Sequence, residues 1–332
     1  MIDAPFSDLT TSDECCFLCG ANEPGITQEH VFPKWLQHRY NLWDQRIGLL
    51  NDTQIQYRNL RIPCCSRCNN EDLSRLETVI ASAVAAGYES ASSLDGRLWY
   101  LWAAKLFYGI LRRELTLLHN RAIPDGGSIV PAATLKSFSN LHMFLQGIRG
   151  RHQFVADPPY SVLVCNLHDV GSLRNYCFRD NLAYMVVALR MGDLGVIVAL
   201  EDGGLTATSY GRFVLEVAGR KLHPIQFDEL CAKVSYQLSL LKGGVSYVTS
   251  KVLEGERPMQ TYVQVGGYLH EWSREEFSKV LRVHVSDWLK DEGLNTQWFV
   301  PPNLVPTWMT AKSGELLLKP LPSWEAGNAL DA

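Results

Sequence analysis

Two short cysteine motifs decide the fold of the N-terminal part of this chain: Cys16-Phe17-Leu18-Cys19 and Cys65-Ser66-Arg67-Cys68. Each motif places two thiolates on one tight turn, and two such pairs can close a single tetrahedral zinc site. Cys15 and Cys64 lie beside the motifs, but they do not give the two-residue spacing. We therefore expect a structural zinc ion held by Cys16, Cys19, Cys65 and Cys68.

The surroundings of the two motifs predict how the zinc site is built. Gly20 follows the first motif and favours a tight turn there. After the second motif, residues 71–88 carry apolar side chains at helical spacing, so Cys65 and Cys68 would lie at the start of a helix. A knuckle and a helix N-terminus that share one zinc ion form a treble-clef arrangement.

The composition is that of an ordinary globular protein, with 46% hydrophobic and 20% charged residues among 332. This length allows two or three domains. No apolar run approaches a membrane span, and residues 1–5 lack the basic and apolar segments of a signal peptide. The cysteines outside the motifs are interpreted as free thiols, which predicts a cytoplasmic protein without a membrane partner.

The charge is unevenly distributed along the chain. The formal net charge is −4, which does not indicate a nucleic-acid-binding protein by itself. Residues 97–151, however, carry eight Lys or Arg against two Asp or Glu. A polyanion could bind this stretch, but on charge alone a solvated helix face is the preferred explanation.

Hydrophobic periodicity predicts an α+β protein in three parts. Helices are expected over residues 71–88, 97–119, 132–147, 227–241 and 273–290. Strands are expected over residues 160–167, 175–178, 183–189, 195–200, 212–217, 245–253 and 261–265. The domains would be a zinc domain over 1–93, a helical linking region over 94–155 and a mixed α+β domain over 156–332. The sheet of the last domain should be largely antiparallel.

The segment between the cysteine motifs resembles a known nuclease family. Gln28-Glu29-His30-Val31-Phe32-Pro33 is followed by Asn59 and then by Asn69, directly after the second motif. This order resembles the HNH endonuclease family over residues 14–77, in the version with a four-cysteine zinc. The resemblance implies a ββα-metal core, in which a hairpin carries His30 and Asn59 and a helix starts near Asn69.

The resemblance also implies a role for each residue. His30 would be the general base, oriented by Asn59, and an imidazole suits proton removal near neutral pH. Glu29 and Asn69 would hold a catalytic Mg²⁺ or Mn²⁺, because hard cations prefer oxygen ligands. The family's last His is replaced by Asn69, so the motif reads H-N-N, and Asn70 could serve instead.

Each of these residues also has a structural explanation. His30 could be an ordinary half-buried histidine, Asn59 could cap a turn, and Asn69 could cap the helix that follows. The four-residue aromatic group Trp99, Tyr100, Trp102 and Tyr108 is expected to be core.

The predicted function is metal-dependent hydrolysis of phosphodiester bonds in DNA, most simply double-stranded DNA. Residues 156–332 would bind the target, a protein partner or a signal ligand, as in an intracellular anti-phage defence effector. The alternative is a non-catalytic treble-clef module that binds nucleic acid or a protein partner. That alternative needs the zinc ion but not Glu29 and His30.

Overall fold

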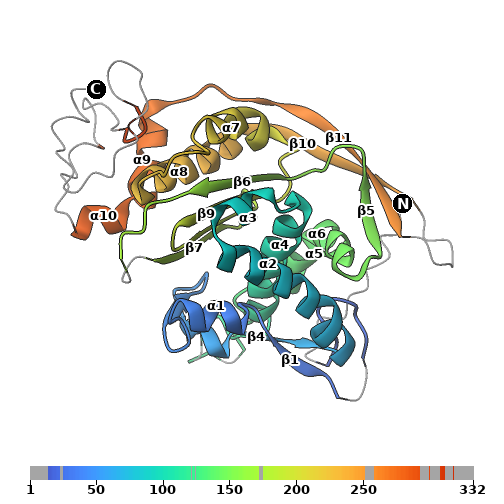
Figure 1. Ribbon diagram of the computed structural model, residues 1–332. Coiled ribbons are helices and arrows are strands. Elements are labelled where there is room, and N and C mark those ends of the chain that lie inside the picture. Colours follow the sequence, from blue (N-terminus) through green and yellow to red (C-terminus); the bar gives the residue numbers. More distant parts are fainter. Residues whose placement is uncertain are drawn as a thin grey trace. The chain divides into compact units, whose positions relative to one another are not determined.

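The computed structural model describes residues 14–291 apart from 23–24, 121, 124, 172–174 and 251–257, together with residues 299, 307–310 and 317. The expectation that residues 1–5 do not form a signal peptide concerns a segment that lies outside these described residues. The fold is α+β, as the sequence predicts (Figure 1). Within the described part, no helix is both long enough and apolar enough to cross a bilayer.

The chain divides into two compact units. Unit 1 comprises Met1–Ala86, Leu94–Asp157 and Tyr247–Val263. Unit 2 comprises Gly87–Ser93, Pro158–Ser246 and Gln264–Ala332. The cysteine motifs and the residues assigned to a nuclease site all belong to unit 1.

A pair of antiparallel strands begins unit 1. Strand β1 (Thr27–His30) pairs with β4 (Arg61–Cys64), so that His30 lies opposite Arg61. The chain between them forms helix α1 (Lys34–Arg39), the two-stranded sheet of β2 (Arg46–Gly48) and β3 (Gln54–Gln56), and a 3₁₀ turn, η1 (Tyr57–Asn59). Asn59 therefore ends a turn that Leu60 separates from β4, and it does not lie on the strand.

The helix predicted after the second cysteine motif is present. It opens as a π-helical turn, η2 (Cys68–Leu73), and continues as α2 (Ser74–Ala86). The side chains that it buries recur at helical spacing and include Leu76, Ile80, Ala83 and Val84. The helix ends at Ala86 because Gly87 takes a left-handed conformation with φ 91°.

Helix α4 (Gly96–Glu114) forms the centre of unit 1. Asp95 caps it by accepting from the backbone N–H of Arg97 at 2.9 Å. The helix is buried on all sides, as its apolar composition predicts, and Lys105 within it is 0% exposed. A Cβ on Gly109 would lie 3.0 Å from Val31, so this helix passes close to the end of β1. The basic stretch is thus not a solvated helix face at Lys105.

The remaining elements of unit 1 include one unexpected pairing. The predicted helix over 132–147 is broken at Phe138 into α5 (Ala132–Ser137) and α6 (Ser139–Leu145), and α6 continues into η3 (Gln146–Arg149). Strand β5 (His152–Val155) pairs in parallel with the first residues of β11 (Met259–Leu269). Strand β10 (Leu241–Thr249) lies on the other side of β11.

Unit 2 is built on a four-stranded sheet in which all neighbouring strands are antiparallel, as predicted. The spatial order is β6-β9-β8-β7, and the strands are β6 (Ser161–Asn166), β7 (Tyr176–Asn181), β8 (Val186–Met191) and β9 (Leu194–Ala199). Helices α7 (Leu205–Glu216) and α8 (Pro224–Leu240) cover one face of it through a shared apolar core (Figure 1). Helix α3 (Tyr88–Ser93) also packs against β6.

One predicted strand of unit 2 is wrong. Residues 212–217 were expected to be extended, but they form the end of α7. Phe213, Val214 and Val217 pack on the sheet core at helical spacing. The helix predicted over 273–290 is present as α9 (Arg274–His284) and α10 (Ser286–Asp291), and Ser273 Oγ accepts from Glu276 N.

Candidate metal centre and active site

The four predicted cysteines converge on one point. The sulfur atoms of Cys16, Cys19, Cys65 and Cys68 all lie within 4.8 Å of one another. Four thiolates bound tetrahedrally to zinc at about 2.3 Å would be spaced about 3.8 Å apart, so this cluster fits a zinc ion. Cys64 Sγ lies 3.9 Å from Cys16 Sγ but is not part of the group. The predicted choice of Cys16 and Cys65, rather than their neighbours Cys15 and Cys64, is therefore confirmed.

Local backbone bonds shape the two halves of this cluster. The N–H of Gly20 donates to Cys16 O at 2.9 Å, and Gly20 has a φ of 73°. This closes the knuckle of the first motif. In the second motif, the N–H of Asn69 donates to Cys65 O at 3.0 Å, which is a helical turn. A knuckle and a helix start thus face each other, as the spacing predicts.

Two side chains, one from α6 and one from the start of η3, hold the knuckle in place, and sequence reasoning missed both. His142 Nε2 lies 2.8 Å from Phe17 O, and Gln146 Nε2 donates to Leu18 O at 2.6 Å. Burial lowers the pKa of His142 to about 4, so the ring is neutral at pH 7. His142 and Gln146 are one helical turn apart, but this spacing indicates a shared contact only when the segment that they contact is known.

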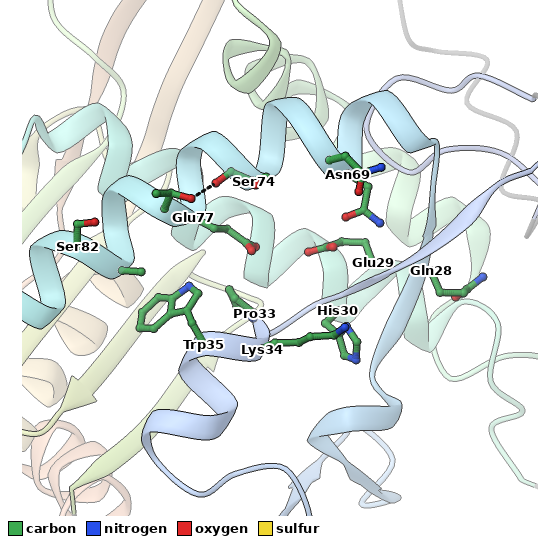
Figure 2. A pocket seen from close by; sticks show the side chains of 13 residues that line it. Gln28, Glu29, His30, Pro33, Lys34, Trp35, Asn69, Ser74, Glu77 and Ser82 are labelled. Atoms are coloured by element: carbon green, nitrogen blue, oxygen red, sulfur yellow. Dashed lines mark hydrogen bonds between the residues drawn. The ribbon is translucent and has the colours of Figure 1, made fainter.

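A cavity of about 560 Å³ lies beside the four-cysteine cluster, between the end of β1 and helix α2 (Figure 2). Its walls include Glu29, His30, Trp35, Asn69, Asn70 and Glu77. Three of the four residues assigned to catalysis therefore meet at one cavity. Asn59 is not among the lining residues.

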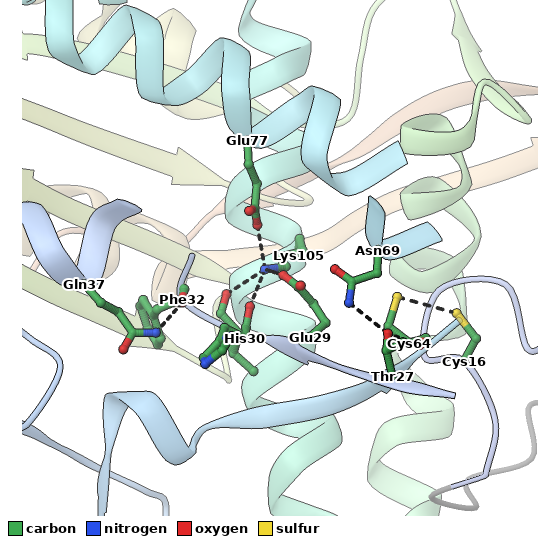
Figure 3. Close-up of polar contacts among 11 residues, drawn as sticks. Cys16, Thr27, Glu29, His30, Phe32, Gln37, Cys64, Asn69, Glu77 and Lys105 are labelled. Carbon is green, nitrogen blue, oxygen red and sulfur yellow. Dashed lines mark hydrogen bonds and ion pairs between the residues drawn. The ribbon is translucent and has the colours of Figure 1, made fainter. Parts of the chain in front are cut away.

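Glu29 binds a buried lysine that sequence reasoning did not assign to the site. Lys105 Nζ donates to Glu29 Oε1 at 2.7 Å and to Glu77 Oε1 at 2.9 Å. It also donates to the carbonyl oxygens of His30 at 2.7 Å and Val31 at 2.9 Å (Figure 3). The signal in the sequence was Lys105 itself, the single charged residue among residues 98–111 of an apolar helix, because a buried ammonium needs partners.

The charges of this cluster shift one another's proton affinity. Burial disfavours the ammonium of Lys105, but Glu29 and Glu77 outweigh it, and the pKa of Lys105 is raised. Lys105 is therefore cationic. Burial raises the pKa of Glu77 to about 7, against the opposing effect of Lys105.

The amide of Asn69 has a fixed orientation. Thr27 Oγ1 donates its hydrogen to Cys64 O at 2.7 Å, so it can only accept from Asn69 Nδ2, which lies 2.9 Å away. The oxygen of Asn69 is thereby turned away from Thr27 (Figure 3). Asn70, by contrast, is exposed, and its Nδ2 donates to Ser66 Oγ at 3.0 Å.

His30 is 7% exposed, and its ring lies beside Trp43, with 5.8 Å between the ring centroids. Its Nε2 is buried and has no hydrogen-bond partner among the described residues. Burial, followed by the charge of Arg61, lowers the pKa of His30 to about 4. The imidazole is thus neutral at pH 7 and has a nitrogen that can accept a proton.

Asn59 is placed differently from the arrangement that the resemblance implies. It is exposed, and its Nδ2 donates to Gln56 Oε1 at 3.2 Å. Among the described residues, no hydrogen bond joins Asn59 to His30. The orienting role of Asn59 therefore stays a prediction without support from this geometry.

Comparison of this chain with models of known protein families, with curated proteins and with solved structures finds no match.

Proposed function

We propose that this protein is a zinc-stabilised, metal-dependent endonuclease of the HNH type that hydrolyses phosphodiester bonds in DNA. The observation that carries the proposal is the meeting of Glu29, His30 and Asn69 at one cavity, directly beside the four-cysteine cluster. A carboxylate, an amide oxygen and an uncharged imidazole are the groups that metal-assisted phosphodiester hydrolysis needs.

The donor set fits a hard divalent cation. Glu29 offers a carboxylate and Asn69 an amide oxygen that is turned away from Thr27. Both are ligand types that Mg²⁺ and Mn²⁺ prefer. When bound, such a cation would neutralise the scissile phosphate and stabilise the leaving oxygen. His30 would take the proton of the attacking water, since its ring is neutral at pH 7.

The proposed substrate is double-stranded DNA. Lys34 is exposed at the rim of the cavity, and Arg61 is partly exposed opposite His30 in the strand pair. Both side chains are suited to contacts with backbone phosphates, which position a nucleic acid without reading its sequence.

A cleavage assay tests this function. Purified protein is incubated with supercoiled plasmid, linear DNA and RNA, with and without Mn²⁺, and with EDTA. His30→Ala should abolish cleavage and keep the zinc content of the wild type. His119→Ala is the matched control, because His119 is an exposed histidine of unit 1 that does not line the cavity. Undiminished cleavage by His30→Ala would rule the scheme out.

A non-catalytic zinc module that binds nucleic acid or protein is the second candidate. Two observations favour it: the ring of His30 is buried, and Asn59 bonds to Gln56 rather than to His30. Metal content separates the two candidates. The nuclease binds an exchangeable Mn²⁺ in addition to zinc, whereas the binding module holds zinc alone and cleaves no substrate.

For unit 2 we propose a sensing or partner-binding role in an intracellular defence effector. It has its own apolar cores and a separate cavity of about 480 Å³, whose lining includes Arg179, Asp180, His284 and Asp287. Arg179→Ala in the full chain should change protection of cells against phage, with plasmid cleavage in vitro unchanged. Unaltered protection would remove the support for this role.

A further inference from the structure

We propose that Lys105 is a positioning residue of the candidate cation site, and that the nuclease core therefore includes helix α4. This inference rests on the proposed function. Glu29 lies on β1 and Asn69 on the helix that continues into α2, so the site depends on how the strand and the helix are held together. Lys105 comes from neither element and contacts both sides.

The contacts of the ammonium connect the strand with the helix. Nζ lies within 2.9 Å of four oxygen atoms: Glu29 Oε1, His30 O, Val31 O and Glu77 Oε1. An ammonium has three hydrogens to donate, so all are used within this cluster. Three of the acceptors belong to the end of β1 and the turn after it, and Glu77 belongs to α2. Lys105 thus fixes the backbone that carries the candidate base.

The same contacts define how Glu29 can bind a cation. Lys105 donates to Oε1 of Glu29 at 2.7 Å, so the carboxylate is held through this oxygen. One carboxylate oxygen of Glu29 is therefore anchored by Lys105, which fixes the orientation of the carboxylate that lines the cavity. Asn69 supplies an amide oxygen at the same cavity. We expect this pair to bind one exchangeable cation.

The ammonium also limits the number of cations. Glu29 and Glu77 both approach Lys105 within 2.9 Å, so the place between the two carboxylates is filled by a positive charge. In a site for two metals, a second divalent cation would bridge such carboxylates. Lys105 stands in that position and offsets the repulsion between them.

Helix α4 is held rigidly enough to serve as this support. It is capped by Asp95, and Gly109 approaches Val31 so closely that an added Cβ would lie 3.0 Å from it. Lys105 and Gly109 are one helical turn apart, so two points of one helix face contact the end of β1. A side chain held on a packed helix gives the precise placement that a metal site requires.

The inference is tested by measuring Mn²⁺ binding to the intact, zinc-loaded chain by electron paramagnetic resonance. Lys105→Met should weaken Mn²⁺ binding roughly 10- to 100-fold, the usual effect of removing a residue that orients a metal ligand. Lys34→Met is the matched control, because it removes a positive charge from the same cavity without a bond to Glu29. The control should change Mn²⁺ affinity only a fewfold, and zinc content should stay the same in both variants.

A double variant covers the case in which Lys105→Met fails to fold. Lys105→Met with Glu77→Gln removes the carboxylate that would be left without its counterion, and Mn²⁺ binding should still be weak because Glu29 stays untethered. Wild-type affinity in the double variant would show that Lys105 only balances Glu77 and would overturn the inference. Failure of both variants to fold would assign Lys105 to stability alone, with the same consequence.

The outcomes separate this inference from the proposed function. If the wild type binds no Mn²⁺, the proposed function fails and the inference fails with it. If the wild type binds Mn²⁺ and Lys105→Met binds it equally well, the function stands and the inference is overturned. Equal weakening by Lys105→Met and Lys34→Met would also overturn it, because Lys34 makes no bond to Glu29 and the loss could not then be assigned to the Lys105–Glu29 contact.

Discussion

The imidazole Nε2 of His142, on helix α6, lies 2.8 Å from the carbonyl oxygen of Phe17 inside the first cysteine motif. A carbonyl oxygen can only accept, so Nε2 carries the hydrogen. The zinc cluster is therefore braced by a helix far along the chain, and its stability should depend on more than its four sulfur atoms.

His142→Ala should lower the stability of unit 1 by about 2 kcal/mol, because it leaves a buried carbonyl without its donor. Thermal unfolding followed by circular dichroism measures this effect, with zinc content as a parallel reading. His119→Ala is a suitable control, since that side chain is exposed. A variant as stable as the wild type would show that the bond contributes nothing.

Cys65→Ala should release the zinc ion and unfold the N-terminal part, because structural zinc supplies folding free energy directly. Cys64→Ala should keep one zinc per chain, since its sulfur is not one of the four that converge. Elemental analysis of the purified variants distinguishes the two. Loss of zinc from Cys64→Ala together with its retention in Cys65→Ala would show that Cys64, and not Cys65, is the zinc ligand.

Asn69→Ala should weaken Mn²⁺ binding by more than the roughly 10- to 100-fold that outer residues of metal sites contribute. Asn70→Ala should have little effect, because its amide is exposed and bonds to Ser66. Both can be measured by isothermal titration calorimetry on zinc-loaded protein. The reverse ranking would make Asn70 the ligand.

Acid should destabilise unit 1 in part through His152, whose pKa is lowered from 6.5 to about 4 by burial and then by Arg97. The unfolded chain binds the proton more readily, so this contribution is present above about pH 6.5 and is lost as the pH falls toward 4. The loss is on the order of 3 kcal/mol. His152→Gln should flatten the acid limb of a urea-unfolding series, and an unchanged limb would contradict the assignment.

Much of the N-terminal architecture could be predicted because local spacing determines it. The two-residue spacing in each cysteine motif selected the correct sulfur atoms. The apolar periodicity over residues 71–88 predicted the helix that follows the second motif. The helix expected over 273–290 begins next to Ser273, whose hydroxyl caps it by accepting from Glu276 N. Each of these signals lies within a single turn or helix.

The remainder depends on contacts between distant segments. Residues 212–217 were predicted to be a strand because Phe213, Val214 and Val217 favour strands. In the structure the three side chains lie on one face of α7 and pack against the four-stranded sheet. The sequence shows Lys105 as an isolated charge and does not show which carboxylates meet it. The position of Asn59 likewise follows from its turn and from Gln56.

The parallel pairing of β5 with residues 259–262 has a practical consequence for dissecting this protein. A truncated chain that stops after the first half would leave β5 with an open hydrogen-bonding edge, and such edges promote aggregation. Inactivity of that truncation would then report damage to unit 1 rather than loss of the role proposed for unit 2. Separating the two roles calls for substitutions within the intact polypeptide, or for a shortened version in which residues 247–263 are grafted back beside β5.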